Sequence, residues 1–164
     1  MLRELFTMKT LGRGWQYTVY DLKNRRDLKR LNSPFATYSV MLRDSFPYIH
    51  HPLWNMPRLY EDAKKAAISS IQKIKDNTLE PWMLANPAVL SDSSYEQDKV
   101  IPLRGYLYKV SFEEGKRIVD AFVEFNKILV EKNCIDKSFD MGNNFGLDSV
   151  GRVVLIDLGE IYDD

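Results

Sequence analysis

The most regular pattern in the sequence is a run of apolar residues at helical spacing between residues 112 and 132. Apolar side chains three and four positions apart lie on one face of a helix. Those of this segment are Ile118, Ala121, Phe122, Phe125, Ile128 and Leu129. Ser111 followed by Glu114 is a capping box, in which the two side chains satisfy backbone N–H groups of the first turn. The pattern predicts a helix that opens at Ser111 and runs to about Lys132.

Two further helices are predicted upstream. Pro57, a residue that favours the first turn of a helix, precedes an apolar stripe flanked by lysines over residues 58–76. The stretch from Ser33 to Pro57 is rich in aromatic residues and prolines and has no such stripe. We expect only a short helix there, around residues 36–45.

Strand patterns occupy the remaining segments. Residues 8–31 are expected to form three strands joined by turns, residues 81–98 two short strands around a polar turn, and residues 144–156 a hairpin whose turn is at 148–151. No internal repeat, low-complexity tract or linker divides the chain. We therefore predict a single α+β domain over residues 1–164.

Charge and cysteine content narrow the function classes. Lysine plus arginine and aspartate plus glutamate both number 23, so no net field attracts polyanions, and nucleic acid is not expected as a partner. No stretch approaches the roughly 20 apolar residues of a membrane span, so no membrane partner is expected either. Cys134 is the only cysteine, which excludes an internal disulfide and fits a reducing compartment. We expect a cytoplasmic protein.

The hairpin near the end of the sequence carries the strongest chemical signal. Asn144 begins its first strand and Asp157 follows its second, so an amide oxygen and a carboxylate lie at the same end of two paired strands. Mg²⁺ prefers such oxygen ligands and shares them with phosphates. A plain hairpin with polar ends would produce the same pattern, so other motifs have to decide.

Residues 140–148 and 153–160 together resemble the catalytic loop and metal-binding triplet of the protein-kinase-like superfamily. Asn144 and Asp157 are separated by 157 − 144 = 13 positions, the usual spacing of that family. The triplet Asp-Leu-Gly, ending at Gly159, stands where the family has Asp-Phe-Gly, and the surrounding residues look closer to HipA-like and small-molecule kinases of bacteria. The given sequence continues for only seven residues after Asp157 (164 − 157 = 7), so the resemblance ends with this motif.

The segment from Leu11 to Tyr20 is similar to the family's nucleotide-binding glycine loop. Gly12 and Gly14 stand at two of its glycines, Tyr17 replaces the third, and Val19 falls on the following strand. The resemblance implies that backbone N–H groups of this turn approach phosphate oxygens.

Further roles follow from the resemblance. Lys29 takes the position of the lysine that holds the α- and β-phosphates, and Leu103 lies in the segment that would contact the adenine edge. Glu61 is the candidate acid that pairs with the lysine, although a glutamate at a helix start is also favoured by the helix macrodipole alone. The family pattern divides the chain into an N-lobe-like part, residues 1–103, and a reduced C-lobe-like part, residues 104–164.

The catalytic base is the main departure from the family pattern. The family places an aspartate five residues before the metal-binding asparagine, where this sequence has Phe139. Three interpretations stay open: Asp140 serves as the base in a shorter loop, Asn143 is the metal ligand of a distorted loop, or the base is lost.

The resemblance implies a protein that binds ATP and Mg²⁺ and transfers the γ-phosphoryl group to a hydroxyl acceptor on a protein or small molecule. The resemblance further implies that Lys29, Asp140 and Asp157 are the catalytic residues and that Asn144 and Asp157 are the metal ligands. The alternative is a pseudokinase-like module that binds a partner protein without efficient transfer. A weaker third possibility is one half of an assembly, which exposed apolar surface on the helix at 112–132 would favour.

Overall fold

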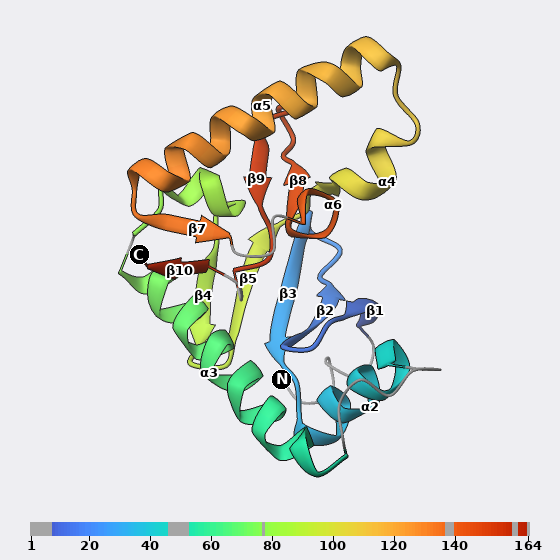
Figure 1. Cartoon of the computed structure of the whole chain (residues 1–164), viewed down its shortest axis with the longest axis vertical. Helices are drawn as coiled ribbons and strands as arrows, with labels where there is room; N and C mark the ends of the chain where they lie inside the picture. The colour runs from blue at the N-terminus through green and yellow to red at the C-terminus, as the bar shows by residue number, and fades with distance from the viewer. Residues whose placement is uncertain (1–7, 46–52, 77, 137–139, 159–160, 164) are drawn as a thin grey trace.

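The computed structural model of the chain describes residues 8–45, 53–76, 78–136, 140–158 and 161–163 (Figure 1). Five strands form an antiparallel sheet in the order β1-β2-β3-β5-β4. Their bounds are β1 Lys9–Arg13, β2 Tyr17–Asp21, β3 Arg26–Leu31, β4 Ala88–Ser91 and β5 Ser94–Asp98. The strands expected within residues 8–31 and 81–98 are thus confirmed.

The register of this sheet determines which side chains face the site. Val19 lies opposite Lys29, and Lys29 lies opposite Tyr95 on the next strand. Side chains directly opposite each other share a face of the sheet, and neighbours along a strand alternate. Tyr17, Val19, Lys29 and Tyr95 therefore share one face, and Thr18 lies on the other.

Two helices adjoin the five-stranded sheet. α2 spans Pro34–Ser45, and α3 spans Met56–Lys75 after a single 3-10 turn, η1, at Leu53–Asn55. Small and apolar residues of α3 are buried: Ala63, Ala67, Ser70, Ile71 and Ile74. α3 lies beside β4 in Figure 1, and the two elements are in contact. Both helices agree with the sequence prediction to within two residues at each end.

The second half of the chain is built on one long helix and short strands. α5 spans Phe112–Glu131, and the Ser111 hydroxyl accepts the Glu114 N–H at 3.3 Å, which confirms the predicted cap. The remaining elements are η2 Pro81–Leu84, β6 Ile101–Pro102, α4 Leu103–Leu107, β7 Cys134–Asp136, α6 Met141–Asn144, β8 Phe145–Leu147, β9 Val153–Leu155 and β10 Ile161–Asp163. The short strands among them form two small sheets, in the orders β6-β8-β9 and β10-β7. The predicted hairpin is β8 and β9, with Asn144 in α6 rather than in the strand.

β6 and the residue before it lie very close to Gly146 of β8. A Cβ at Gly146 would lie 2.9 Å from Val100 Cγ2 and 3.0 Å from the Ile101 carbonyl oxygen. Gly146 pairs with Pro102, so only glycine allows β6 to reach the hairpin at this distance.

A continuous core joins the two halves. Phe145 is fully buried, and its ring centroid lies 4.8 Å from that of Phe122 and 6.0 Å from that of Phe125, both on α5. The same buried cluster includes Tyr17 and Ala67 from the sheet and α3. Within the described ranges, no helix has the length and apolar character needed to cross a bilayer.

Candidate functional site

Lys29 is a buried cation at the centre of the sheet. Its side chain is 7% exposed, and Nζ donates a hydrogen bond to the carbonyl oxygen of Ile156 and lies 5.8 Å from the centroid of the Tyr95 ring. Burial lowers the pKa of Lys29, and the carboxylates of Asp157 and Asp27 only partly oppose that effect. A buried amine with incomplete compensation is suited to receive an anion.

The hairpin brings the two predicted metal ligands together through their backbones. The N–H groups of Ile156 and Asp157 donate to the Asn144 carbonyl oxygen at 2.7 and 3.3 Å. Asn144 is buried, whereas Asp157 is partly exposed. The structure thus places residues 144 and 157 side by side, and the same segment contacts Lys29 through Ile156.

A cleft of about 740 Å³ lies where these elements meet. The cleft is lined by the turn after β1, by one face of β2 and β3, and by one side of α3. Single residues of α2, α4, α6 and the segment after β9 also line it. Its lining residues are Gly14, Trp15, Gln16, Tyr17, Val19, Lys29, Arg43, Leu59, Asp62, Ala63, Ala66, Arg104, Asn143 and Asp157. Four residues predicted from the sequence, Gly14, Val19, Lys29 and Asp157, therefore share one cavity.

A second cavity of about 770 Å³, mainly apolar, adjoins the cleft. Ile101 and Pro102 line it from the segment that the family resemblance assigned to adenine contact, and Ile156 lines it too. Arg104 and Asn143 line both cavities, and Arg104 Nη1 lies 3.4 Å from Asn143 Oδ1. Leu103, predicted to contact the nucleotide, is instead fully buried in the first turn of α4 and lines neither cavity.

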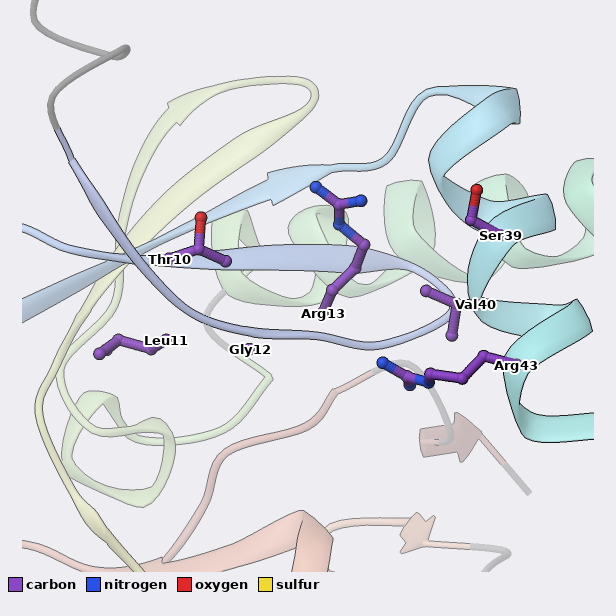
Figure 2. Close-up of a pocket in the computed structure, with 7 residues that line it drawn as sticks. All are labelled: Thr10, Leu11, Gly12, Arg13, Ser39, Val40 and Arg43. Atoms are coloured by element: carbon purple, nitrogen blue, oxygen red, sulfur yellow. The ribbon is translucent and has the colours of Figure 1, made fainter.

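The glycines of the turn occupy less constrained positions than the motif suggests. Gly12 lies in β1, opposite Val19, and lines a groove of about 290 Å³ beside α2 rather than the cleft (Figure 2). Arg43 of α2 lines both that groove and the cleft. A Cβ at Gly12 would meet nothing within 4 Å, and one at Gly14 only the Tyr17 carbonyl oxygen at 4.0 Å. Both glycines have room for a side chain.

The structure does not bring Glu61 to Lys29. Glu61 is exposed on α3, where its Oε2 lies 3.9 Å from Lys64 Nζ. The α3 residues that line the cleft are Leu59, Asp62, Ala63 and Ala66, which lie on a different side of the helix. The prediction failed because the long stretch before α3 left the helix register undetermined by the motif.

Tyr17 links α3 to the sheet where the acid was expected. Its hydroxyl donates to the Ala67 carbonyl oxygen at 2.7 Å. Burial raises the pKa of Tyr17, an effect strengthened by the charge of Asp157 and weakened by a hydrogen bond with Ser70. The link between α3 and the sheet is therefore uncharged at this point.

Asp140 is the N-cap of α6. Its Oδ1 accepts the N–H groups of Gly142 and Asn143, each at 3.1 Å, and its Oδ2 lies 2.5 Å from Asn143 Nδ2. Asp140 is exposed and is not among the residues that line the cleft, whereas Asn143 is. Both oxygens of the candidate base thus hold the local turn. Phe139 and Gly159 lie outside the described residues.

Comparisons with known proteins show the fold and nothing finer. No protein-family model matches the sequence, and no curated protein matches it significantly. Among solved structures the chain is similar to Rv3197 of Mycobacterium tuberculosis in complex with erythromycin, with a TM-score of 0.56 and 13% identity, covering 94% of this chain and 46% of that one. It is also similar to WbdD bound to the kinase inhibitor LY294002, with a TM-score of 0.52 and 15% identity, covering 92% of this chain and 32% of that one.

These likenesses, with the sheet order and the cleft, define the class of fold. The chain has an α+β fold of the kinase-like type, with an antiparallel five-stranded sheet and a helical part that carries the β8–β9 hairpin, as the sequence predicts. It spans less than half the length of either matched structure.

Proposed function

We propose that the cleft binds ATP with Mg²⁺ and that the chain transfers the γ-phosphoryl group to a hydroxyl acceptor. The observation that carries the proposal is the buried, incompletely compensated Lys29, which shares one cavity with Asp157 and the turn after β1. A buried cation opposite a carboxylate suits a ligand that carries its own negative charge together with a divalent ion.

The side chains present fit such a ligand. Asp157 and Asn144 offer the oxygen ligands that Mg²⁺ prefers, and phosphate oxygens would complete its coordination. When bound, the metal ion supplies neutralisation of the charge on the transferred group. Lys29 would hold the phosphates from the sheet side, and the apolar cavity beside Ile101 and Pro102 has room for the base.

A second candidate function is a nucleotide-binding regulatory module that contacts a partner protein. The engagement of Asp140 with α6 favours it, because a carboxylate that already accepts three hydrogen bonds is poorly placed to orient an acceptor hydroxyl. Phosphoryl transfer depends mainly on positioning and charge neutralisation, so loss of the base slows transfer more than it weakens binding.

Thermal unfolding with and without ATP and Mg²⁺ tests the proposal. A ligand at a hundredfold excess over its Kd stabilises the native state by about 2.7 kcal/mol. For a domain of this size that corresponds to a rise in Tm of roughly 5–10 °C. Asp157→Ala removes the shift. Asp120→Ala, which removes an exposed carboxylate on α5, keeps it.

The outcomes separate the candidates. A wild-type protein whose Tm is unchanged by ATP and Mg²⁺ refutes nucleotide binding in this cleft. If ATP binds, incorporation of label from γ-labelled ATP into an acceptor in wild type, but not in Asp157→Ala, supports the kinase. Binding without incorporation supports the regulatory module.

A further inference from the structure

Asn32 binds the turn between β1 and β2 at three backbone carbonyl groups. The Gly14 and Trp15 carbonyl oxygens accept hydrogen bonds from Asn32 Nδ2 at 2.7 and 3.2 Å. The Gln16 carbonyl oxygen accepts the Asn32 backbone N–H at 2.8 Å. All three successive carbonyl groups of the turn are therefore bound by one asparagine, which is 4% exposed.

Neighbouring buried hydroxyls complete the network. The Thr18 hydroxyl donates to Asn32 Oδ1 at 2.6 Å and accepts Arg13 Nε at 3.0 Å. The Thr37 hydroxyl, on α2, donates to the Trp15 carbonyl oxygen at 3.1 Å. Both amide protons of Asn32 go to acceptors that cannot donate, and its oxygen accepts a hydroxyl, so its side-chain orientation is determined.

The network lies on the side of the sheet away from the cleft. Thr18 alternates with Tyr17 and Val19, which line the cleft, so Thr18 and the Asn32 amide group bound to it lie on the opposite face. In a planar trans peptide the C=O and the following N–H point in opposite directions. Carbonyl groups of Gly14 and Trp15 drawn towards Asn32 therefore turn the N–H groups of Trp15 and Gln16 towards the cleft.

We infer that Asn32 is a positioning residue that aims the backbone N–H groups of Trp15 and Gln16 at the phosphates of a bound nucleotide. The inference rests on the proposed function and adds the residue that shapes its anion-binding turn. Successive N–H groups directed into a concave surface bind anions. Glycine is not what gives the turn this shape, because a side chain fits at Gly12 and Gly14 without a clash.

The test compares ligands with and without phosphates. Affinities of adenosine, ADP and ATP, the latter two with Mg²⁺, are measured by displacement of a fluorescent nucleotide. Asn32→Leu has a similar volume and none of the three side-chain hydrogen bonds. We expect it to weaken ADP and ATP about tenfold or more and to leave adenosine within about twofold, because only phosphates contact the turn. Thr37→Val, which removes one hydrogen bond to the turn, should show a smaller loss of the same kind.

Two controls isolate the orientation of the turn. Leu129→Val lowers stability in the core beneath α5, away from the turn, and should leave all three affinities unchanged. Asp120→Ala, which removes an exposed carboxylate on α5, should also bind all three ligands as the wild type does. If Asn32→Leu does not fold, Asn32→Asp, which keeps the acceptor for Thr18 and removes both donors, takes its place.

The failures of the two proposals are distinguishable. A wild-type protein that binds none of the three ligands refutes the proposed function, and this inference with it. Wild-type binding with an unchanged ATP-to-adenosine ratio in Asn32→Leu and Thr37→Val overturns the inference alone. An equal loss for adenosine and ATP also overturns it, since Asn32 would then only maintain the fold.

Discussion

Replacement of Lys29 by methionine should separate the stability of the fold from the function of the cleft. Methionine keeps the length and unbranched shape of the lysine stem and removes its charge. Lys29 is 7% exposed, and burial lowers its pKa despite the nearby carboxylates of Asp157 and Asp27. A lowered lysine pKa means that the folded protein disfavours the charged form relative to water. Lys29→Met should therefore make the ligand-free protein more stable.

The size of the effect follows from two opposing contributions. Replacing a whole buried ion pair by apolar side chains of similar volume stabilises by about 1–4 kcal/mol, whereas removing one partner destabilises when the other charge stays fully buried. Asp157 and Asp27, the carboxylates near Lys29, are both partly exposed, so Lys29→Met leaves no fully buried charge behind and the stabilising contribution should dominate. The hydrogen bond to the Ile156 carbonyl oxygen is lost, which costs about 1 kcal/mol. We expect a net gain of about 1 kcal/mol in the free energy of unfolding, or a rise in Tm of roughly 2–4 °C.

Urea and thermal unfolding, each with and without ATP and Mg²⁺, measure both consequences of Lys29→Met. The variant should unfold later than the wild type without ligand and show no shift with ligand. Its advantage should shrink as the pH rises towards 10.5, because Lys29 loses its proton at a lower pH in the folded than in the unfolded wild-type protein. Lys127→Met, on the exposed side of α5, is the control and should change stability by less than about 0.5 kcal/mol. A clear loss of stability in Lys29→Met would contradict the reasoning, because it would mean that the carboxylates more than compensate for burial.

Three other predictions concern the pH dependence, the cap of α6 and the approach at the hairpin. At alkaline pH below 10.5, ATP binding should take up a proton, because the phosphates raise the lowered pKa of Lys29, and the affinity for ATP should fall as the pH rises. Calorimetry in buffers of different ionisation enthalpy measures the proton uptake. Its absence in the wild-type protein would refute the contact between Lys29 and the phosphates. Asp140→Ala should lower stability by about 1 kcal/mol through loss of the N-cap, whereas Asp140→Asn should preserve it. Transfer at the wild-type rate in Asp140→Asn would exclude Asp140 as the base, and a slower rate with unchanged ATP binding would support that role. Gly146→Ala should destabilise by about 2 kcal/mol or more in urea unfolding because its Cβ would lie 2.9 Å from Val100 Cγ2, while Gly105→Ala in α4, where a Cβ has open space, should be neutral or stabilising.

The sequence predicted the long elements because their side chains alone specify them. The periodicity of α5 and its capping box define a helix without reference to the rest of the chain. Short elements were missed for the opposite reason: β7, at Cys134–Asp136, is a strand only because β10 pairs with it. Nothing in three residues of sequence predicts such a partner.

Within the site, the sequence located residues on regular elements and failed at those that depend on loop geometry. Lys29 and Val19 were each assigned to the site from the sequence, and the antiparallel pairing of β2 and β3 places them opposite each other. Glu61 and Leu103 were assigned from their order along the family pattern. Glu61 lies on a different side of α3 from the residues that line the cleft, and Leu103 is buried, so neither residue lines either cavity. The role of Asn32 in fastening the turn had no local signal, because its partners lie 14 to 18 positions away.

The backbone hydrogen bonds of Ile156 determine which substitutions the protein can accept at this position. The backbone N–H of Ile156 donates to the Asn144 carbonyl oxygen, and the Ile156 carbonyl oxygen accepts a hydrogen bond from the Lys29 amine. The sheet and the hairpin are therefore joined through backbone atoms that every amino acid except proline provides. Exchange of the side chain at this position leaves that junction intact, and only proline, which lacks the donor, breaks it. Relatives of this chain can therefore change the character of the apolar cavity at residue 156 while the alignment of amine and carboxylate persists.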